Sequence, residues 1–320
     1  MQNRNQKFEN FIYNILRFRC LLKEKTVNKF FIKNKESMQL LNQAFIHKSF
    51  DAVTNYELLE FRGDVIVNAC VVEFITDNYP LIVSIKWNTR LKHTLVSGKV
   101  LARMAVRNGF EEFLQVSDEL RERFNTFPDK WDCEDYQAAY EDTVEALCGA
   151  ISQILNKHTT KGVGYVACYN LISSFLKEEH ISLEYEDVFD AKSRLKEVFD
   201  AKKWNDIAGC RLSDCLYSME VNEKSLDKYM KESSRNKGFA NTNSSIVNSN
   251  DRFIAFGYAC IDGNPKNKTL LSVTTANKKK NAEQKAADEV IKRLTRMGIS
   301  LPIPNAYEVV AKKQHKPKNV

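Results

Sequence analysis

Acidic side chains recur at helical spacing in Asn55–Ile75, NYELLEFRGDVIVNACVVEFI. Read at about 100° per residue, four polar positions fall on one face of a helix: Glu57, Glu60, Asp64 and Asn68. The neighbouring positions are apolar, and no basic residue stands in register to neutralise the stripe. Like charges at this spacing repel one another when water is partly excluded, so the stripe favours a bound cation.

A second acidic pair lies in the segment AAYEDTVEALCGAI, where Asp142 and Glu145 are one helical turn apart among apolar residues. If this helix packs on the first, the carboxylates of both converge. Oxygen ligands without Cys or His suit Mg²⁺ or Mn²⁺, and not zinc. Either acidic group alone also fits an ordinary solvated helix face. Both together in apolar helices favour a metal site.

The cysteines argue against two other kinds of site. All eight are scattered, without a Cys-x-x-Cys pair or paired His spacing, which disfavours both zinc and a disulfide framework. Most are expected to be buried free thiols. His47, in AFIHKSF, is interpreted as a packing and hydrogen-bonding residue.

Helical periodicity dominates residues 6–185, and no alternating strand pattern interrupts it. Helices are predicted near residues 55–75, 91–108, 135–155 and 164–178. This half is therefore predicted to be an all-α domain that positions both acidic groups.

After Asp190 the pattern changes. A short amphipathic helix with an aspartate start signal is predicted at 190–202, and a polar stretch at 213–250 is predicted to be a long loop or insertion. Two strand-like runs follow at 253–261 and 269–275, and then a helix at 279–297. This order predicts a small α+β domain, and the basic tail completes the chain.

The formal net charge of +7 divides unevenly. Residues 1–189 hold 23 Lys and Arg against 26 Asp and Glu, a net charge of −3, while the rest holds 25 against 15, a net charge of +10. This asymmetry predicts two domains with different roles. No apolar run resembles a secretory signal or a membrane span, so we expect an intracellular protein, cytoplasmic or nuclear, without a membrane partner.

The run YELLEFRGDVIVN resembles the signature segment of ribonuclease III enzymes. Three further segments resemble that family in the same order: LLNQAFIHKSF, TLVSGKVLARMA and EDTVEALCGAI. The resemblance covers roughly residues 35–155. It implies an endoribonuclease that hydrolyses phosphodiester bonds of double-stranded RNA with two Mg²⁺ ions, for which Mn²⁺ can substitute, and without a small-molecule cofactor. It also implies a homodimer, because one such domain cuts one strand.

The resemblance assigns roles to individual positions. Glu60, Asp64, Asp142 and Glu145 fall on the family's metal-binding carboxylates. Asp64 and Glu145 are also its implied catalytic residues, together with Glu57 at a supporting acidic position. Arg62 departs from the family, which usually has an apolar residue there, and the stretch after Pro80 lacks an acidic residue often found in the family.

The C-terminal segment KKNAEQKAA is similar to the signature of double-stranded-RNA-binding domains, and DAKSRLKE is similar to their first helix. The resemblance implies RNA contacts at Lys196 and Glu197, and at Lys278, Lys279 and Lys280, where a helix N-terminus also favours phosphate. The 213–250 stretch replaces the family's usual short loop, which leaves one of its RNA contacts unassigned.

These observations predict an all-α ribonuclease III endonuclease domain at 1–187, a small α+β (α-β-β-β-α) double-stranded-RNA-binding domain at 188–298, and a basic tail at 299–320. The alternative is a non-catalytic RNA-binding or ribosome-associated protein on the same scaffold. Retention of all five carboxylates favours the enzyme. A chain that acts only beside a partner subunit is a third possibility.

Overall fold

The computed structural model describes residues 2–200, 216–220, 245–246, 251–259 and 269–298, and also residues 222, 224, 225, 227, 228, 231 and 248. The chain divides into two compact units, 1–181 and 182–320, and each is described by itself. The predicted tail at 299–320 lies outside the described residues. Among the helices that are described, none is long and apolar enough to cross a membrane.

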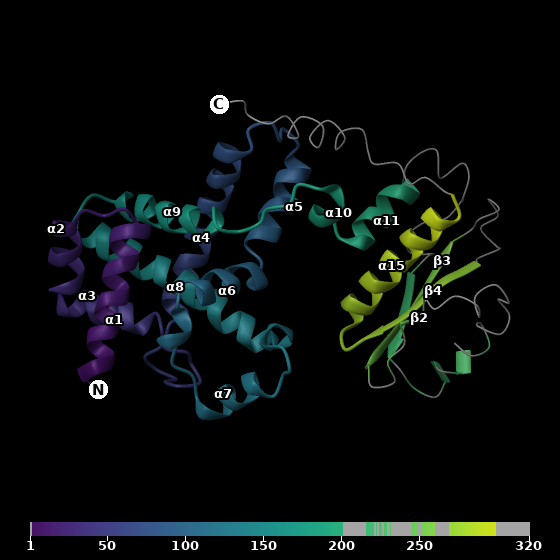
Figure 1. Ribbon diagram of the computed structural model, residues 1–320, viewed down its shortest axis with the longest axis horizontal. Coiled ribbons are helices and arrows are strands. Elements are labelled where there is room, and N and C mark those ends of the chain that lie inside the picture. The colour runs from purple at the N-terminus through teal and green to yellow at the C-terminus, as the bar shows by residue number, and fades with distance from the viewer. Residues whose placement is uncertain are drawn as a thin grey trace. The chain divides into compact units, whose positions relative to one another are not determined.

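In its described residues the first unit contains helices and no β-strand, as predicted (Figure 1). Its α-helices are α1 (Gln2–Asn14), α2 (Glu24–Val27), α3 (Lys35–Gln43), α4 (Glu57–Asn78), α5 (Ile85–Leu95), α6 (Gly98–Arg107), α7 (Asp118–Asn125), α8 (Glu134–His158) and α9 (Val163–Leu176). Short π- and 3₁₀-helical turns lie between them at Ile15–Arg19, Asn28–Ile32, Phe110–Glu112 and Lys130–Asp132.

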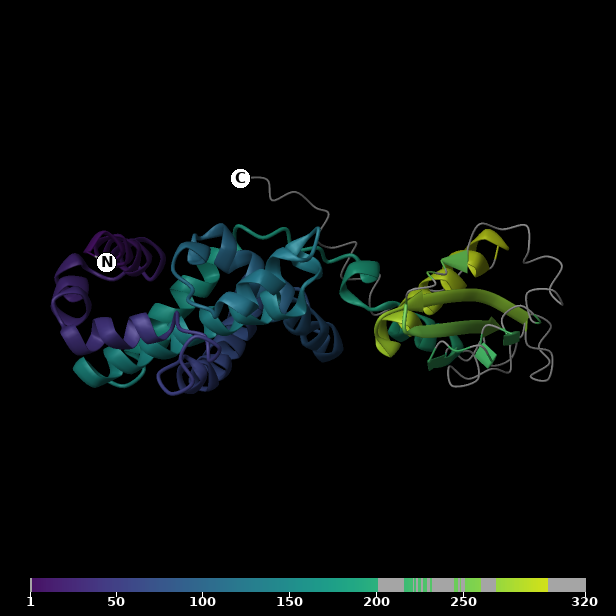
Figure 2. The same cartoon turned by 90° about the horizontal axis from the view of Figure 1, so that it is seen from below.

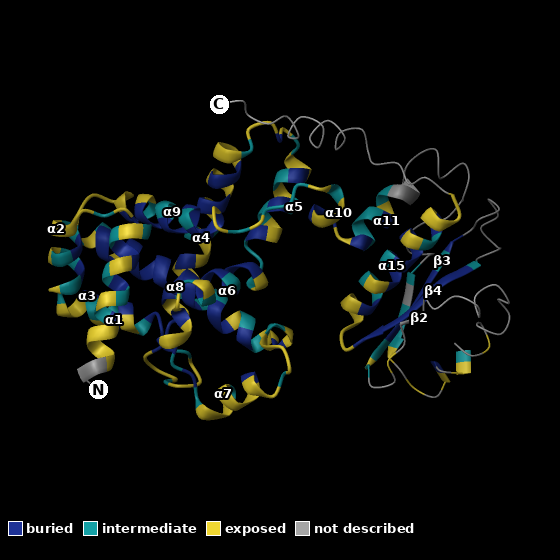
Figure 3. Cartoon of the chain, viewed as in Figure 1, coloured by how far each residue is buried: buried dark blue, intermediate teal, exposed yellow. Residues whose placement is uncertain are grey.

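Helices α4 and α8 form the centre of this unit, with α9 packed against both. They touch through backbone at two glycines. A Cβ atom on Gly63 would lie 1.7 Å from the carbonyl oxygen of Glu145, and one on Gly149 would lie 2.1 Å from the carbonyl oxygen of Leu59. The middle of α8 is buried, as Figure 3 shows. Close approach of the two backbones therefore fixes how the acidic helices meet.

The prediction of a single helix at 91–108 is wrong, because the helix is interrupted between α5 and α6. Ser97 adopts an extended backbone, and its hydroxyl donates to the carbonyl oxygen of Thr94 at 2.7 Å. Gly98 then begins α6 at a point where a Cβ atom would lie 2.3 Å from a carboxylate oxygen of Glu141. Glycine at this position leaves room for that side chain.

Five cysteines lie within the described residues, and all are buried free thiols, which confirms the prediction for them: Cys20, Cys70, Cys133, Cys148 and Cys168. The other three, Cys210, Cys215 and Cys260, lie outside the described residues.

The second unit contains α10 (Tyr185–Val188), α11 (Ala191–Asp200), β1 (Leu216–Glu220), β2 (Ser245–Ile246), β3 (Phe253–Ala259), β4 (Thr269–Ala276) and α15 (Lys279–Arg296). The strand order is β1-β3-β4-β2, in which β3 is antiparallel to β1 and β4, and the short β2 is parallel to β4. Helix α15 lies along one face of the strands, where Ala255 and Ala276 pack against Ala282 and Ala286 (Figures 1 and 2).

Two further expectations differ from the structure. The stretch 213–250 contains strands β1 and β2, so it is not wholly a loop; Ser218 of β1 donates to Glu283 of α15 at 2.5 Å. The first unit ends at Ile181 and not at residue 187. Helix α10 lies in the second unit, where the Tyr185 hydroxyl donates to Glu197 at 2.7 Å. The aspartate start signal of α11 is confirmed, since Asp190 accepts from the Ser193 N–H at 3.0 Å.

Candidate functional site

The contact between α4 and α8 brings the two predicted acidic groups to one place. Helix α4 carries Glu57, Glu60 and Asp64, and α8 carries Asp142 and Glu145. Because Gly63 packs on the backbone of Glu145, each stripe lies beside the other. Their charges act on one another: Asp64 raises the pKa of Glu145, and Asp142 raises that of Glu60.

Glu145 is the most deeply placed of these carboxyl groups, with a relative exposure of 6%. Burial raises its pKa to about 9, and the charge of Asp64 adds to that effect. Burial also raises the pKa of Asp142 and, together with the charge of Asp142, that of Glu60. Desolvation and like charge both disfavour the ionised carboxylates, which is the condition that a divalent cation relieves.

Sequence reasoning missed Glu141, which belongs to the same group. Burial and, to a smaller extent, the charges of Asp142 and Asp64 raise its pKa to about 7. A signal was present in the sequence, since Glu141 stands four residues before Glu145 and so shares its helix face.

Neighbouring polar groups hold three of the carboxylates. The buried Tyr56 hydroxyl donates to Asp142 Oδ2 at 2.9 Å. Asn68 Nδ2 donates to Asp64 Oδ1 at 2.7 Å, and Lys48 Nζ lies 2.9 Å from Glu57 Oε1. Asn68 therefore supports the stripe from within it. Nothing in the sequence pattern pointed to Tyr56, because its partner is distant in the chain.

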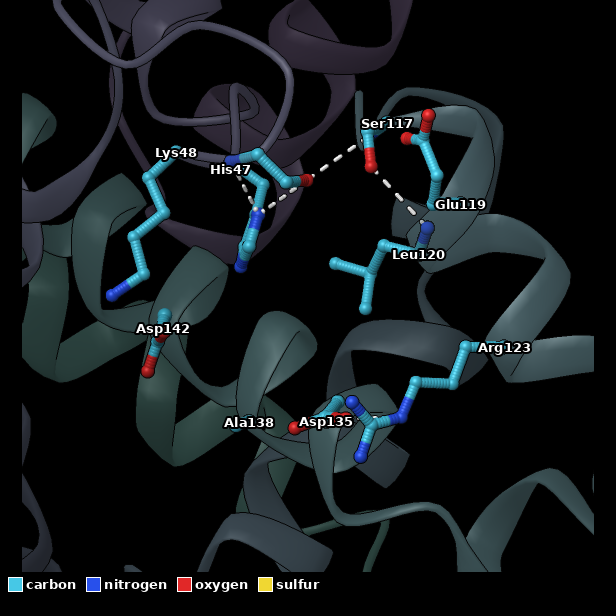
Figure 4. A pocket seen from close by; sticks show the side chains of 10 residues that line it. His47, Lys48, Ser117, Glu119, Leu120, Arg123, Asp135, Ala138 and Asp142 are labelled. Atoms are coloured by element: carbon cyan, nitrogen blue, oxygen red, sulfur yellow. Dashed lines mark hydrogen bonds and ion pairs between the residues drawn. The ribbon is translucent and has the colours of Figure 1, made fainter.

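A hollow of about 480 Å³ opens beside Asp142 (Figure 4). Nδ1 of His47 accepts the Ser49 N–H at 2.9 Å, and its other ring nitrogen points into the hollow. The ring also packs edge-on against Tyr56, with centroids 5.6 Å apart. His47 is thus a packing and hydrogen-bonding residue, as predicted. On the far side of the hollow, Arg123 pairs with Asp135 at 2.8 Å.

The donor chemistry of the site fits a hard divalent cation. Its carboxylates supply only oxygen, which suits Mg²⁺ or Mn²⁺. Within the described part of the chain, no three His, Cys, Asp or Glu side chains are close enough together to hold an ion as they stand. Binding an ion would therefore require the acidic side chains to turn toward one another.

The predicted RNA-binding residues lie in the second unit. Lys278 precedes α15, Lys279 and Lys280 are its first residues, and all three are exposed. Lys196 is exposed on α11, and Glu197 beside it accepts the hydrogen bond from Tyr185. The three lysines are therefore together at one helix N-terminus, where backbone N–H groups favour anions.

Residues 57–153 match the ribonuclease III domain. This range contains the six carboxyl groups of the acidic site: Glu57, Glu60, Asp64, Glu141, Asp142 and Glu145.

Relatives of similar description come from viruses and bacteria. A protein of Frog virus 3 (isolate Goorha), named as a ribonuclease 3, is 30% identical over 56% of this chain and 45% of its own length. One of Invertebrate iridescent virus 6, named likewise, is 26% identical over 54% of this chain and 61% of its own. The chain thus spans about half of these two relatives. The ribonuclease 3 of Ehrlichia canis (strain Jake) is 29% identical over 56% of this chain and 73% of its own length.

Among solved structures, the nuclease domain of the Campylobacter jejuni ribonuclease III is 22% identical, with a TM-score of 0.38, and the match covers 53% of this chain and 97% of that one.

Proposed function

Residues 57–153 belong to the ribonuclease III family, and from this premise we propose that the chain is an endonuclease that hydrolyses phosphodiester bonds of double-stranded RNA. The observation that carries the proposal is the meeting of two acidic helices at the Gly63 contact, with the pKa of Glu145 raised to about 9. Such a cluster destabilises the metal-free fold. A reaction that depends on a divalent cation would explain why the chain carries it.

Glu60, Asp64, Asp142 and Glu145 would hold Mg²⁺, with Mn²⁺ as a substitute. When bound, divalent ions lower the pKa of water and stabilise charge on a transferring phosphoryl group. Hydrogen bonds from neighbouring residues orient two of these ligands. Asn68 orients Asp64, and Tyr56 orients Asp142. Glu57, paired with Lys48, is the supporting acidic residue.

An apolar surface on α4 supports a homodimer. Leu58, Phe61 and Val65 follow helical spacing and are 77%, 73% and 66% exposed. We define these three residues as the α4 stripe. It runs along the same turns as the carboxylates, so a second copy seated on it would bring its own acidic group close to the first, in a symmetric dimer with one site for each strand. Arg62, between them, donates to Gln153 of α8 at 2.5 Å.

The second unit would bind the duplex through phosphates at Lys278, Lys279 and Lys280, and through the minor groove at Lys196 and Glu197. Support comes from the exposure of the lysines and from the α15 N-terminus beneath them. The order of helix α11, antiparallel strands β1, β3 and β4, and helix α15 also supports the proposed RNA-binding domain, to which the short parallel strand β2 is an addition.

The direct test is cleavage of labelled duplex RNA by the purified chain with Mg²⁺. Asp64→Asn and Glu145→Gln should abolish cleavage and leave duplex binding intact. The exposed, unrelated Glu24→Gln serves as a control and should cut at the normal rate. Duplex binding without any cleavage by the unaltered protein would instead favour the non-catalytic RNA-binding protein.

A further inference from the structure

We infer that Tyr56 is a positioning residue for the metal ligands: its hydroxyl fixes the orientation of Asp142 and thereby sets the affinity of the site for divalent cations. The inference rests on the proposed function, because that function gives the metal site its purpose. Its test does not depend on that function, because the experiment measures ion binding directly.

The geometry ties the two acidic helices together through one side chain. Tyr56 immediately precedes α4, the helix of Glu57 and Glu60, and its hydroxyl donates to Asp142 Oδ2 of α8 at 2.9 Å. The residue is only 2% exposed, which limits the access of water to this hydrogen bond. A buried phenol thus crosses from the start of one acidic helix to a carboxylate of the other.

Tyr56 is itself held firmly. Its backbone N–H donates to the carbonyl oxygen of Ile46 at 3.0 Å, and its ring meets His47 edge-on, at an interplanar angle of 80°. His47 is in turn fixed by the Ser49 N–H at Nδ1. The hydroxyl therefore approaches Asp142 from a fixed direction.

One hydrogen bond to Oδ2 leaves the carboxylate with further lone pairs and fixes the plane in which they point. A carboxylate without that partner can rotate, and ordering it again opposes ion binding. Loss of such outer partners typically weakens metal affinity about 10–100-fold. We expect an effect near the lower limit, because Asp142 is one of four proposed ligands.

The experiment compares two Tyr→Phe variants of the full chain. Tyr56→Phe removes the hydroxyl and keeps the ring. Tyr136→Phe is the matched control: Tyr136 is 3% exposed, lies on α8, and donates to Glu111 at 2.6 Å, away from the acidic group. Mn²⁺ binding is measured by the electron paramagnetic resonance of free Mn²⁺, and unfolding is followed in parallel.

Tyr56→Phe should bind Mn²⁺ about tenfold more weakly than the unaltered protein, and Tyr136→Phe should bind it equally well. Cleavage by Tyr56→Phe should need about tenfold more metal for half-maximal rate, and at saturating metal it should return to within about threefold of normal. A merely structural role would lower the unfolding temperature and leave the Mn²⁺ affinity unchanged, which would overturn the inference.

A double variant tests whether Tyr56 acts through Asp142. In an Asp142→Asn background, Tyr56→Phe should change Mn²⁺ affinity by less than about twofold, because the group that it orients is already altered. A full tenfold effect there would refute the inference. Mn²⁺ binding by the unaltered protein without any RNA cleavage would refute the proposed function alone, since the effect of Tyr56 is read from the binding.

Discussion

Replacing Gly63 with alanine should force α4 and α8 apart. The new Cβ atom would lie 1.7 Å from the carbonyl oxygen of Glu145, whereas ordinary contact begins at 3.4 Å, so the backbones must separate by about 1.7 Å at this point. Neither partner is the end of a flexible side chain that can turn away. The shift would move Asp142 and Glu145 relative to the carboxylates of α4.

The expected cost in the free energy of unfolding follows from two opposing effects. Overpacking in a core costs about 1–3 kcal/mol, and occasionally more, and backbone on both sides argues for the upper end. Alanine gains about 1 kcal/mol over glycine in a helix. We therefore expect a net loss of about 2 kcal/mol. Any remaining folded protein should cut RNA about 100-fold more slowly, because ligands displaced by about 1 Å or more lose their alignment.

Urea unfolding measures the first quantity, and single-turnover cleavage with saturating Mg²⁺ measures the second. Gly109→Ala is the matched control: Gly109 has a positive φ of 82°, and a Cβ atom added there would meet nothing within 4 Å, so this variant should lose about 1 kcal/mol of stability and no activity. A Gly63→Ala protein with normal stability and normal cleavage would refute the close contact and the account of the site built on it.

Three further outcomes are expected. Without metal, the unfolding temperature should fall as pH rises from about 5 to 9, because the raised pKa of Glu145 means that folding opposes its ionisation. Addition of Mg²⁺, or the substitution Glu145→Gln, should reduce this dependence on pH. An unfolding temperature that does not change with pH in EDTA would contradict the prediction. Phe61→Glu should convert a dimer to a monomer in sedimentation experiments. Val83 is 86% exposed and lies outside the α4 stripe, so Val83→Glu should leave the dimer intact. A dimer in both variants would exclude the α4 stripe as the interface. Removing residues 190–320 should weaken duplex binding and its salt dependence more than the cleavage rate at saturating RNA, and unchanged binding would locate RNA recognition in the first unit.

The sequence predicted the acidic stripes because helical periodicity is local. Glu57, Glu60 and Asp64 share a helix face wherever α4 lies. Their meeting with Asp142 was a conditional expectation, since it depends on which faces of two distant helices pack together. The contact at Gly63 decides this, and no periodicity encodes a backbone contact.

The features that sequence reasoning missed have local or long-range causes. The break between α5 and α6 lies at Ser97, whose extended backbone and hydrogen bond to Thr94 are local features that the apolar periodicity does not show. Strand β1 was hidden because its five residues stand in an Asn- and Lys-rich stretch, and pairing with β3 supplies what local propensity lacks. Tyr56 has a role only through a partner on α8. For β1 and Tyr56, a long-range contact decided the outcome.

The contact between Gly63 and Glu145 also bears on how the chain folds. It joins positions roughly 80 residues apart, so it forms only after a large loop has closed. The same event brings Glu141 and Glu145 into a partly buried interface, where burial and neighbouring carboxylates raise their pKa values. Bringing the two helices together therefore works against the repulsion among these carboxylates, and a divalent cation present during folding should reduce that opposition.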